Sequence, residues 1–218
     1  MIIHPGPRPT LVYLVRHGES QFNLEKRMSG QLDPPLSSEG VDQSQALADR
    51  LRAVPLTGIY TSALRRTVET AEPTAAIHGL PIHPTTALNE MHLGVLEGRY
   101  RDARDPEAKV LWEERKRDKR HYRIPEGESF LDLAERVKES LKKILTAQRG
   151  GIILIVGHRN TNRVLFGMLM QRPEEEWPHL DLKRRYVYEI AVHDRPELAL
   201  IHLTANRAGL RSVSITAS

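Results

Sequence analysis

Two short apolar runs place the strongest constraint on how this chain folds. Residues 10–15 read TLVYLV and residues 152–156 read IILIV, and short runs rich in β-branched residues are typical of strands buried within a sheet. A histidine follows each run within two residues, His17 after the first and His158 after the second. Because ligands bind at the carboxyl ends of strands in open α/β sheets, both histidines are predicted to lie at a ligand-binding edge.

Helical and extended patterns alternate along the rest of the chain. Apolar residues recur at helical period from Phe130 to Leu145, behind a capping box formed by Ser129 and Asp132, which predicts an amphipathic helix. The other predicted elements are a helix containing Ser44, Leu47, Ala48 and Leu51, a strand over 58–61, a helix over 63–78, and a hairpin of strands over 186–192 and 198–203. This order favours a sheet covered by helices on both faces.

Length and composition are those of one soluble α/β domain. The chain has 218 residues, of which 39% are hydrophobic and 28% are charged. We predict a single domain over 10–212, preceded by a Pro-rich arm over 1–9 and followed by a tail over 213–218. Residues 91–126 are polar and weakly periodic, and they are predicted to form an insertion over the sheet edge.

Several classes of protein are disfavoured by the sequence. It contains no cysteine, which excludes disulfides, thiolate catalysis and cysteine–zinc sites. The histidines lack the spacing to a carboxylate that a zinc-hydrolase helix requires, so no metal is expected. No apolar run is long enough to span a membrane, and the N-terminal MIIHPGPRPT does not resemble a signal peptide. A cytoplasmic location is the default expectation.

The net charge of +4 is concentrated in one stretch. Residues 115–123 read RKRDKRHYR, which could be a solvated helix face or could bind an anionic partner. Nucleic-acid binding is disfavoured because aromatic residues make up only 5% of the chain and no stacking motif is apparent.

The residues around His17 suit phosphoryl chemistry. An imidazole nucleophile needs a phosphorus electrophile and cations around its oxygens, and Arg16 supplies planar donors that stay charged. Gly18 would allow an anion to approach the backbone. Glu19, Ser20 and Asn23 follow.

These residues belong to a larger set of motifs that occur in order along the chain. They are VRHGESQFN (15–23), LSSEG (36–40), SALRRTVETA (62–71), LNEMHLGVLEG (88–98), PEGES (125–129) and VGHRNTNR (156–163). The set resembles the histidine phosphatase superfamily, in the branch that holds phosphoglycerate mutases, fructose-2,6-bisphosphatases and small phosphatases. The resemblance implies a three-layer α/β/α sandwich with a mixed, mostly parallel sheet and a capping insertion over the C-terminal strand edge. It also implies phosphoryl transfer without a metal or cofactor.

The resemblance also implies a role for each matching residue. His17 matches the nucleophile, and Arg16 and Arg66 match the arginines that clamp the phosphate. His158 matches the histidine that donates to the phosphoryl oxygens, and Glu90 matches the proton donor. The family's substrate-loop positions are occupied by Asn23, Ser29 and Gly30.

The basic stretch before PEGES resembles the cap of fructose-2,6-bisphosphatase, where basic residues and a tyrosine hold a second phosphate and the sugar. The matching candidates are Arg115, Lys119 and Tyr122, together with Arg159 and Arg163 from the loop of the second histidine. The substrate is therefore predicted to be a small phosphorylated metabolite, with a sugar bisphosphate and other phosphomonoesters both left open.

Two departures from the mutases favour a phosphatase. Arg159 stands where the mutases carry glycine, and Leu93 stands where they place a substrate-contacting tyrosine. A phosphoglycerate mutase stays the alternative, and a non-catalytic anion- or nucleic-acid-binding protein is the alternative of another class. The expected partner is a phosphorylated small molecule and not nucleic acid or a membrane, and a homodimer is left open.

Overall fold

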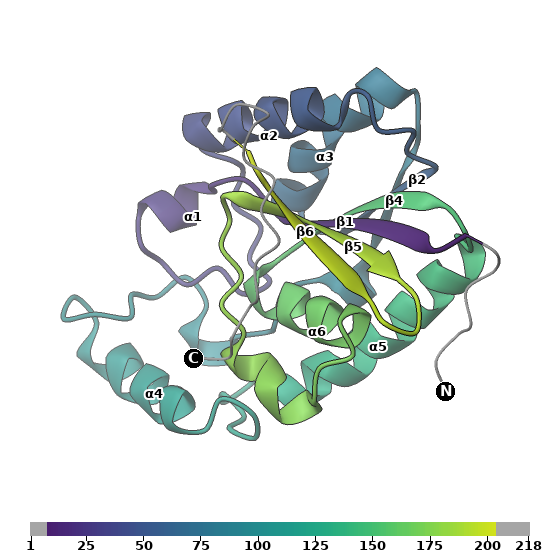
Figure 1. The fold of residues 1–218 in the computed structure, drawn as a ribbon. Helices are drawn as coiled ribbons and strands as arrows, with labels where there is room; N and C mark the ends of the chain where they lie inside the picture. The colour runs from purple at the N-terminus through teal and green to yellow at the C-terminus, as the bar shows by residue number, and fades with distance from the viewer. Residues whose placement is uncertain (1–7, 204–218) are drawn as a thin grey trace.

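The computed structural model describes residues 8–203. The predicted domain end at 212, the tail over 213–218 and most of the arm over 1–9 therefore lie outside the described residues. One six-stranded sheet has the strand order β3-β2-β4-β1-β5-β6 (Figure 1). The first four strands of this order pair in parallel, and β5 and β6 add an antiparallel hairpin beside β1. The strands are β1 (Thr10–Arg16), β2 (Gly58–Ser62), β3 (Ile82–Thr85), β4 (Ile152–Gly157), β5 (Tyr186–Val192) and β6 (Glu197–His202).

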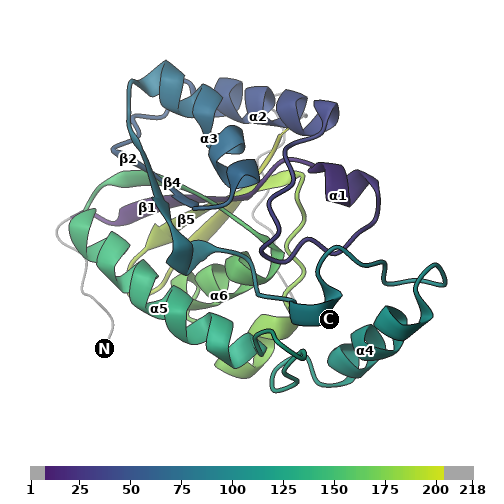
Figure 2. The same cartoon turned by 180° about the vertical axis from the view of Figure 1, so that it is seen from behind.

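Helices cover both faces of the sheet, which confirms the predicted three-layer sandwich. Figure 1 and Figure 2 show α2 (Ser38–Leu51) and α3 (Arg65–His78) on one face, and α5 (Phe130–Ala147) and α6 (Arg159–Leu169) on the other. The remaining helices are α1 (Gln21–Leu24), α4 (Pro106–Arg117) and the 3₁₀ helices η1 (Thr86–Leu88), η2 (Gly94–Leu96) and η3 (Glu174–His179). None of the helices within residues 8–203 is both long and apolar enough to cross a membrane.

Alternation along β1 divides the core into two clusters. Val12 and Leu14 pack into the cluster that includes α5 and α6, whereas Tyr13 and Val15 pack into the cluster that includes α2 and α3. Successive side chains of a strand point to opposite faces, so a strand that is apolar throughout must be covered on both sides. This is why the runs at 10–15 and 152–156 predict central strands correctly.

The register of the two central strands sets the position of both histidines. Arg16 of β1 is paired with Gly157 of β4, and the backbone N–H of His17 donates to the Gly157 carbonyl at 3.0 Å. His17 and His158 therefore leave the sheet side by side. The segment over 91–126, which contains α4, lies at this end of the sheet (Figure 2).

The reason for glycine at position 18 differs from the sequence-based one. A Cβ on Gly18 would lie 2.6 Å from the carbonyl oxygen of Gly40, so what approaches Gly18 is the start of α2 and not an anion. A Cβ on Gly40 would in turn overlap the carbonyl of Glu19. The RHGES and LSSEG motifs thus form one close backbone contact, which requires glycine on both sides.

Besides the short α1 and the 3₁₀ helices, three elements are not indicated by the sequence patterns. β3 contains Pro84 and lies at the sheet edge, the place where a strand tolerates proline. α4 is too polar to show a periodic stripe, and α6 is buried on nearly every side. The helix expected over 63–78 begins later, at Arg65, because the N–H of Leu64 is bound by the Ser62 hydroxyl at 3.1 Å.

Replacing Gly167 in α6 by alanine is expected to destabilise the protein. Alanine favours a helix over glycine by about 1 kcal/mol, but a Cβ here would overlap the indole ring of Trp177. We expect a net loss of roughly 1–2 kcal/mol in the free energy of unfolding, measured by urea denaturation. Gly79→Asn is the control, since Gly79 has a positive φ that asparagine tolerates and a Cβ there meets no atom within 4 Å. A Gly167→Ala variant as stable as the parent would contradict this packing.

Candidate active site

His17 is held in the tautomer that a nucleophile needs. The ring is buried, and Nδ1 lies 2.6 Å from the carbonyl oxygen of Gly18. A carbonyl can only accept, so Nδ1 carries the proton and Nε2 keeps its lone pair. Burial, followed by the neighbouring His158 and Arg66, holds the pKa of His17 well below its usual value. The ring is therefore neutral near neutral pH.

His158 lies against His17 and has one nitrogen without a partner. The two ring centres are 5.1 Å apart. Nε2 of His158 is 2.8 Å from the Ser62 hydroxyl, which can donate to it, while Nδ1 is buried without a hydrogen-bond partner in the described part of the chain. Donation by Ser62 leaves Nδ1 as an N–H group that is available to an oxyanion.

Two arginines of the motifs reach the same pocket. Arg66 is only 1% exposed, and it donates to the carbonyls of Leu32 at 2.7 Å and Gly30 at 2.8 Å. The neighbouring Arg65 instead points outward and pairs with Glu69, so of the two adjacent arginines Arg66 is the one that lines the pocket. Burial, then Arg184, lowers the pKa of Arg16 to about 9.

Glu90 brings a carboxylate to the positively charged pocket. Its side chain accepts the backbone N–H of Met91 at 2.8 Å and that of Asn160 at 3.2 Å. The segment that carries it is fixed by Arg136 of α5, which donates to the carbonyls of Ala87, Asn89 and Glu90 at 2.8–3.0 Å. Sequence reasoning did not identify Arg136.

Three of the hydrogen-bond donors without partners belong to arginines of one pocket, and a fourth belongs to His158, whose ring packs against His17 but is not among the residues that line that pocket. Within residues 8–203, Nε of Arg16, Nε of Arg66, Nε of Arg184 and Nδ1 of His158 are buried and make no hydrogen bond. Arg16, Arg66 and Arg184 line one pocket with His17 and Glu90. Buried donors are costly to leave unsatisfied, so the arrangement suits a bound oxyanion. The described residues hold no cluster of three or more His, Cys, Asp or Glu side chains suited to a metal ion.

A sequence model of the histidine phosphatase superfamily (branch 1) matches residues 12–203. The chain belongs to this superfamily. The "Probable phosphoglycerate mutase GpmB" of Salmonella arizonae is 40% identical to it over 147 residues, which are 67% of this chain and 68% of the relative. The structure of the alpha-ribazole phosphatase from Shigella flexneri matches with a TM-score of 0.79 at 29% identity, covering 88% of this chain and 96% of that one. A mycobacterial glucosyl-3-phosphoglycerate phosphatase matches with a TM-score of 0.75 at 27% identity, covering 89% and 99%.

The superfamily assignment and the phosphatase neighbours confirm the predicted family, fold class and class of enzyme. The predicted substrate-loop residues Asn23, Ser29 and Gly30 all line the pocket of His17. Gly30 has a φ of 49°, and a Cβ there would overlap the carboxylate of Glu97, so its backbone conformation and its packing both require glycine.

A second pocket adjoins the first and is lined by the basic cap. Arg115, Lys119 and Arg163 line it, and Arg159 lines both pockets. The predicted alternative of a solvated helix face is wrong for Arg115, which is only 4% exposed. Burial, then Arg163, lowers the pKa of Lys119. Positive charges gathered in this way favour an anionic ligand.

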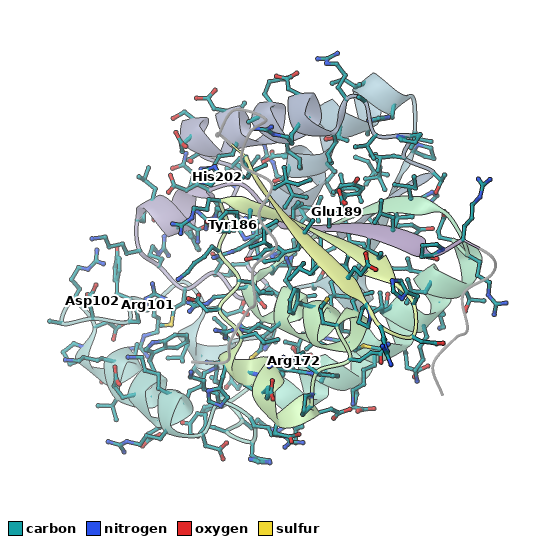
Figure 3. The ribbon with its side chains drawn as sticks, viewed as in Figure 1. Arg101, Asp102, Arg172, Tyr186, Glu189 and His202 are labelled. Atoms are coloured by element: carbon teal, nitrogen blue, oxygen red, sulfur yellow. The ribbon has the colours of Figure 1, made fainter. Side chains whose placement is uncertain are left out.

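The structure does not bring Tyr122 to either pocket. Its hydroxyl donates to the carboxylate of Glu114 at 2.8 Å, so this side chain braces the cap. Sequence reasoning also missed residues that do line the pockets, namely Lys26, Arg101, Trp112, Asn160 and Arg184. Figure 3 shows Arg101 beside Asp102 on the segment before α4. The sequence does not indicate in which direction a single arginine or tryptophan side chain on a polar segment points.

The ring of His17 is expected to stay neutral as the pH falls through 6.5, the ordinary pKa of histidine. Burial and nearby positive charge penalise the imidazolium, so the proton binds only at lower pH. Nitrogen NMR of the free enzyme in phosphate-free buffer measures this directly. Arg66→Met removes one of the cations and should raise the pKa of His17. A His17 ring that becomes half protonated at about pH 6.5 would contradict the described environment.

Proposed function

We propose that this chain hydrolyses small phosphomonoesters through a phosphohistidine on His17. The observation that carries the proposal is the set of buried, unpartnered donors from Arg16, Arg66 and His158 around a neutral imidazole. Such donors stabilise the charge that spreads over a phosphoryl group during transfer, and this stabilisation usually contributes most of the rate enhancement in this kind of catalysis.

The proposed reaction has two steps. Nε2 of His17 attacks phosphorus, so that a P–N bond forms while the bond to the leaving oxygen breaks and Glu90 protonates that oxygen. Water then attacks the phosphorus of the phosphohistidine, so that a P–O bond forms while the P–N bond breaks and its electron pair returns to Nε2 of His17. Glu90 takes up a proton from the water, and inorganic phosphate leaves. Glu90 suits both roles because it lines the pocket and backbone N–H groups fix its carboxylate.

The second pocket supports a narrower substrate class. We propose that the substrate carries a second anionic group, as a sugar bisphosphate or a phosphorylated acid does, which binds Arg115, Lys119, Arg159 and Arg163. The two pockets share Lys26, Arg101, Trp112, Arg159 and Asn160, so one elongated ligand could occupy both. One structural neighbour is itself named a glucosyl-3-phosphoglycerate phosphatase.

A phosphoglycerate mutase is the second candidate, favoured by the names of curated relatives such as the Salmonella protein. Leu93 and Arg159 both line the pocket of His17, at the two positions where the sequence departs from the mutases. A hydrocarbon at the position of a substrate-binding hydroxyl favours hydrolysis over rebinding of a phosphoglycerate. A cytoplasmic location and a homodimer are further proposals that rest on the sequence alone.

We expect the parent enzyme to hydrolyse p-nitrophenyl phosphate in the presence of EDTA, and we expect the His17→Ala variant to have lost this activity. The substitution removes the nucleophile, and the proposed chemistry needs no dissociable metal. Quenching turnover of a ³²P-labelled phosphomonoester should trap a label that is stable in base and labile in acid. The proposed mechanism would be contradicted if the His17→Ala variant kept its activity or if the chelator abolished the activity of the parent enzyme.

Lys119→Ala is expected to affect substrates unequally. It should lower kcat/KM for a sugar bisphosphate by about tenfold, the effect of losing one charge-assisted hydrogen bond, and hardly change that for p-nitrophenyl phosphate. Lys109→Ala, which removes an exposed lysine from α4 outside both pockets, is the control. Equal losses on both substrates would remove the second pocket from the account of specificity.

A further inference from the structure

A third arginine enters the pocket from outside the family motifs. Arg184 lies in the turn between η3 and β5, two residues before Tyr186, which Figure 3 labels at the start of β5. The residues beside it point elsewhere, because Lys183 pairs with Asp181 and the Arg185 guanidinium lies 5.1 Å from the ring centre of Tyr186. Of these three consecutive basic residues, only Arg184 lines the pocket.

The turn is tied to the sheet, so Arg184 has a fixed direction. Tyr188 is buried in β5, and its hydroxyl accepts the backbone N–H of Lys183 at 2.6 Å. The side chain of Arg184 is 23% exposed, and its Nε is one of the buried donors without a partner among residues 8–203. An unused N–H on a desolvated guanidinium suits an anion that completes its hydrogen bonds.

Arg184 also determines how the amide of Asn23 is turned. Nη2 of Arg184 donates to Oδ1 of Asn23 at 2.7 Å, and the N–H of Ser20 donates to the same atom at 3.3 Å. Both partners are donors, so this atom must be the amide oxygen, and Nδ2 is the N–H end of the amide. Asn23 lines the pocket, and it can therefore offer N–H groups to an anion while Arg184 occupies its oxygen.

The positive charge of Arg184 is only partly balanced. Within residues 8–203 its ion-pair partner is Glu19, whose carboxylate lies 4.0 Å from Nη1 and also accepts the Ser37 hydroxyl at 3.1 Å. Burial is the main cause of the lowered pKa of Arg16, and the charge of Arg184 is the next. The two guanidinium groups are thus close enough to repel each other, and a bound dianion would turn that repulsion into attraction to a shared ligand.

We propose that Arg184 is a third phosphate-binding arginine, which contacts the substrate's phosphoryl oxygens beside Arg16 and holds Asn23 with its amide N–H groups toward the same anion. The inference rests on the proposed function, since it concerns the same pocket, and it adds a substrate contact that the family motifs do not contain.

Binding of inorganic phosphate and vanadate tests the inference without turnover. Arg184→Met keeps much of the side-chain length and removes the charge, and Arg185→Met is the matched control on the adjacent, outward-pointing residue. We expect the Kd of phosphate, measured by calorimetry, and the Ki of vanadate to rise about tenfold or more in Arg184→Met and to stay unchanged in Arg185→Met. Arg184→Lys should give intermediate values. Thermal unfolding checks that each variant is folded, and Arg184→Gln replaces the methionine variant if that one is not.

The Asn23→Ala variant tests the second half of the inference. If Arg184 acts partly by holding Asn23, the losses in phosphate affinity will be less than additive in the double variant, whereas additive losses would overturn that part. A folded Arg184→Met enzyme that binds both anions like the parent overturns the whole inference, even if the parent is an active phosphatase. Weakened anion binding in Arg184→Met together with a parent that hydrolyses no phosphomonoester would support Arg184 and refute the proposed function.

Discussion

The parallel pairing of β1 with β4 is the constraint on which the pocket depends. Because Arg16 is in register with Gly157, His17 and His158 emerge at the same level with ring centres 5.1 Å apart. Side chains alternate along a strand, so a shift of one residue would turn Val12 and Leu14 toward the wrong helices. The core therefore enforces the register that chemistry at the strand ends requires.

The pocket at this edge of the sheet gathers several positive charges, and their burial lowers the stability of the folded chain. Arg16, Arg66 and Arg184 line one cavity with Glu19 and Glu90 as its acidic groups, and desolvation disfavours each guanidinium. Any anion that binds only the folded chain offsets this cost by mass action. The same residues thus explain both why the charged side chains at this site are costly to bury and why the proposed oxyanion would be attracted to them.

Sequence reasoning predicted the parts of the site that depend on local pattern. The buried runs indicated the strand ends that carry His17 and His158, and the family resemblance pointed to Arg66, which the structure buries in the pocket. Tyr122 illustrates the limit of sequence reasoning. Its side chain turns toward Glu114 of α4, to which its hydroxyl donates a hydrogen bond, and not toward a pocket. Arg184 and Arg136 act through tertiary contacts with segments more than forty residues distant, and no local pattern encodes those contacts.

Contacts around the pockets divide the residues into a group whose positions depend on one another and a group in the cap that can vary more freely. Glu97 accepts the N–H groups of Gln31 at 2.8 Å and Leu93 at 2.9 Å, so one carboxylate ties the substrate loop to the segment that follows Glu90. The cap residues Arg115 and Lys119 make no contact of this kind with the strand ends: Arg115 reaches the sulfur of Met91, and Lys119 reaches His179. Substitutions in the cap can therefore change the lining of the second pocket while His17, Arg16 and Arg66 keep their geometry. This division is what would let one phosphoryl-transfer site serve relatives named for substrates as different as ribazole phosphate and glucosyl-3-phosphoglycerate.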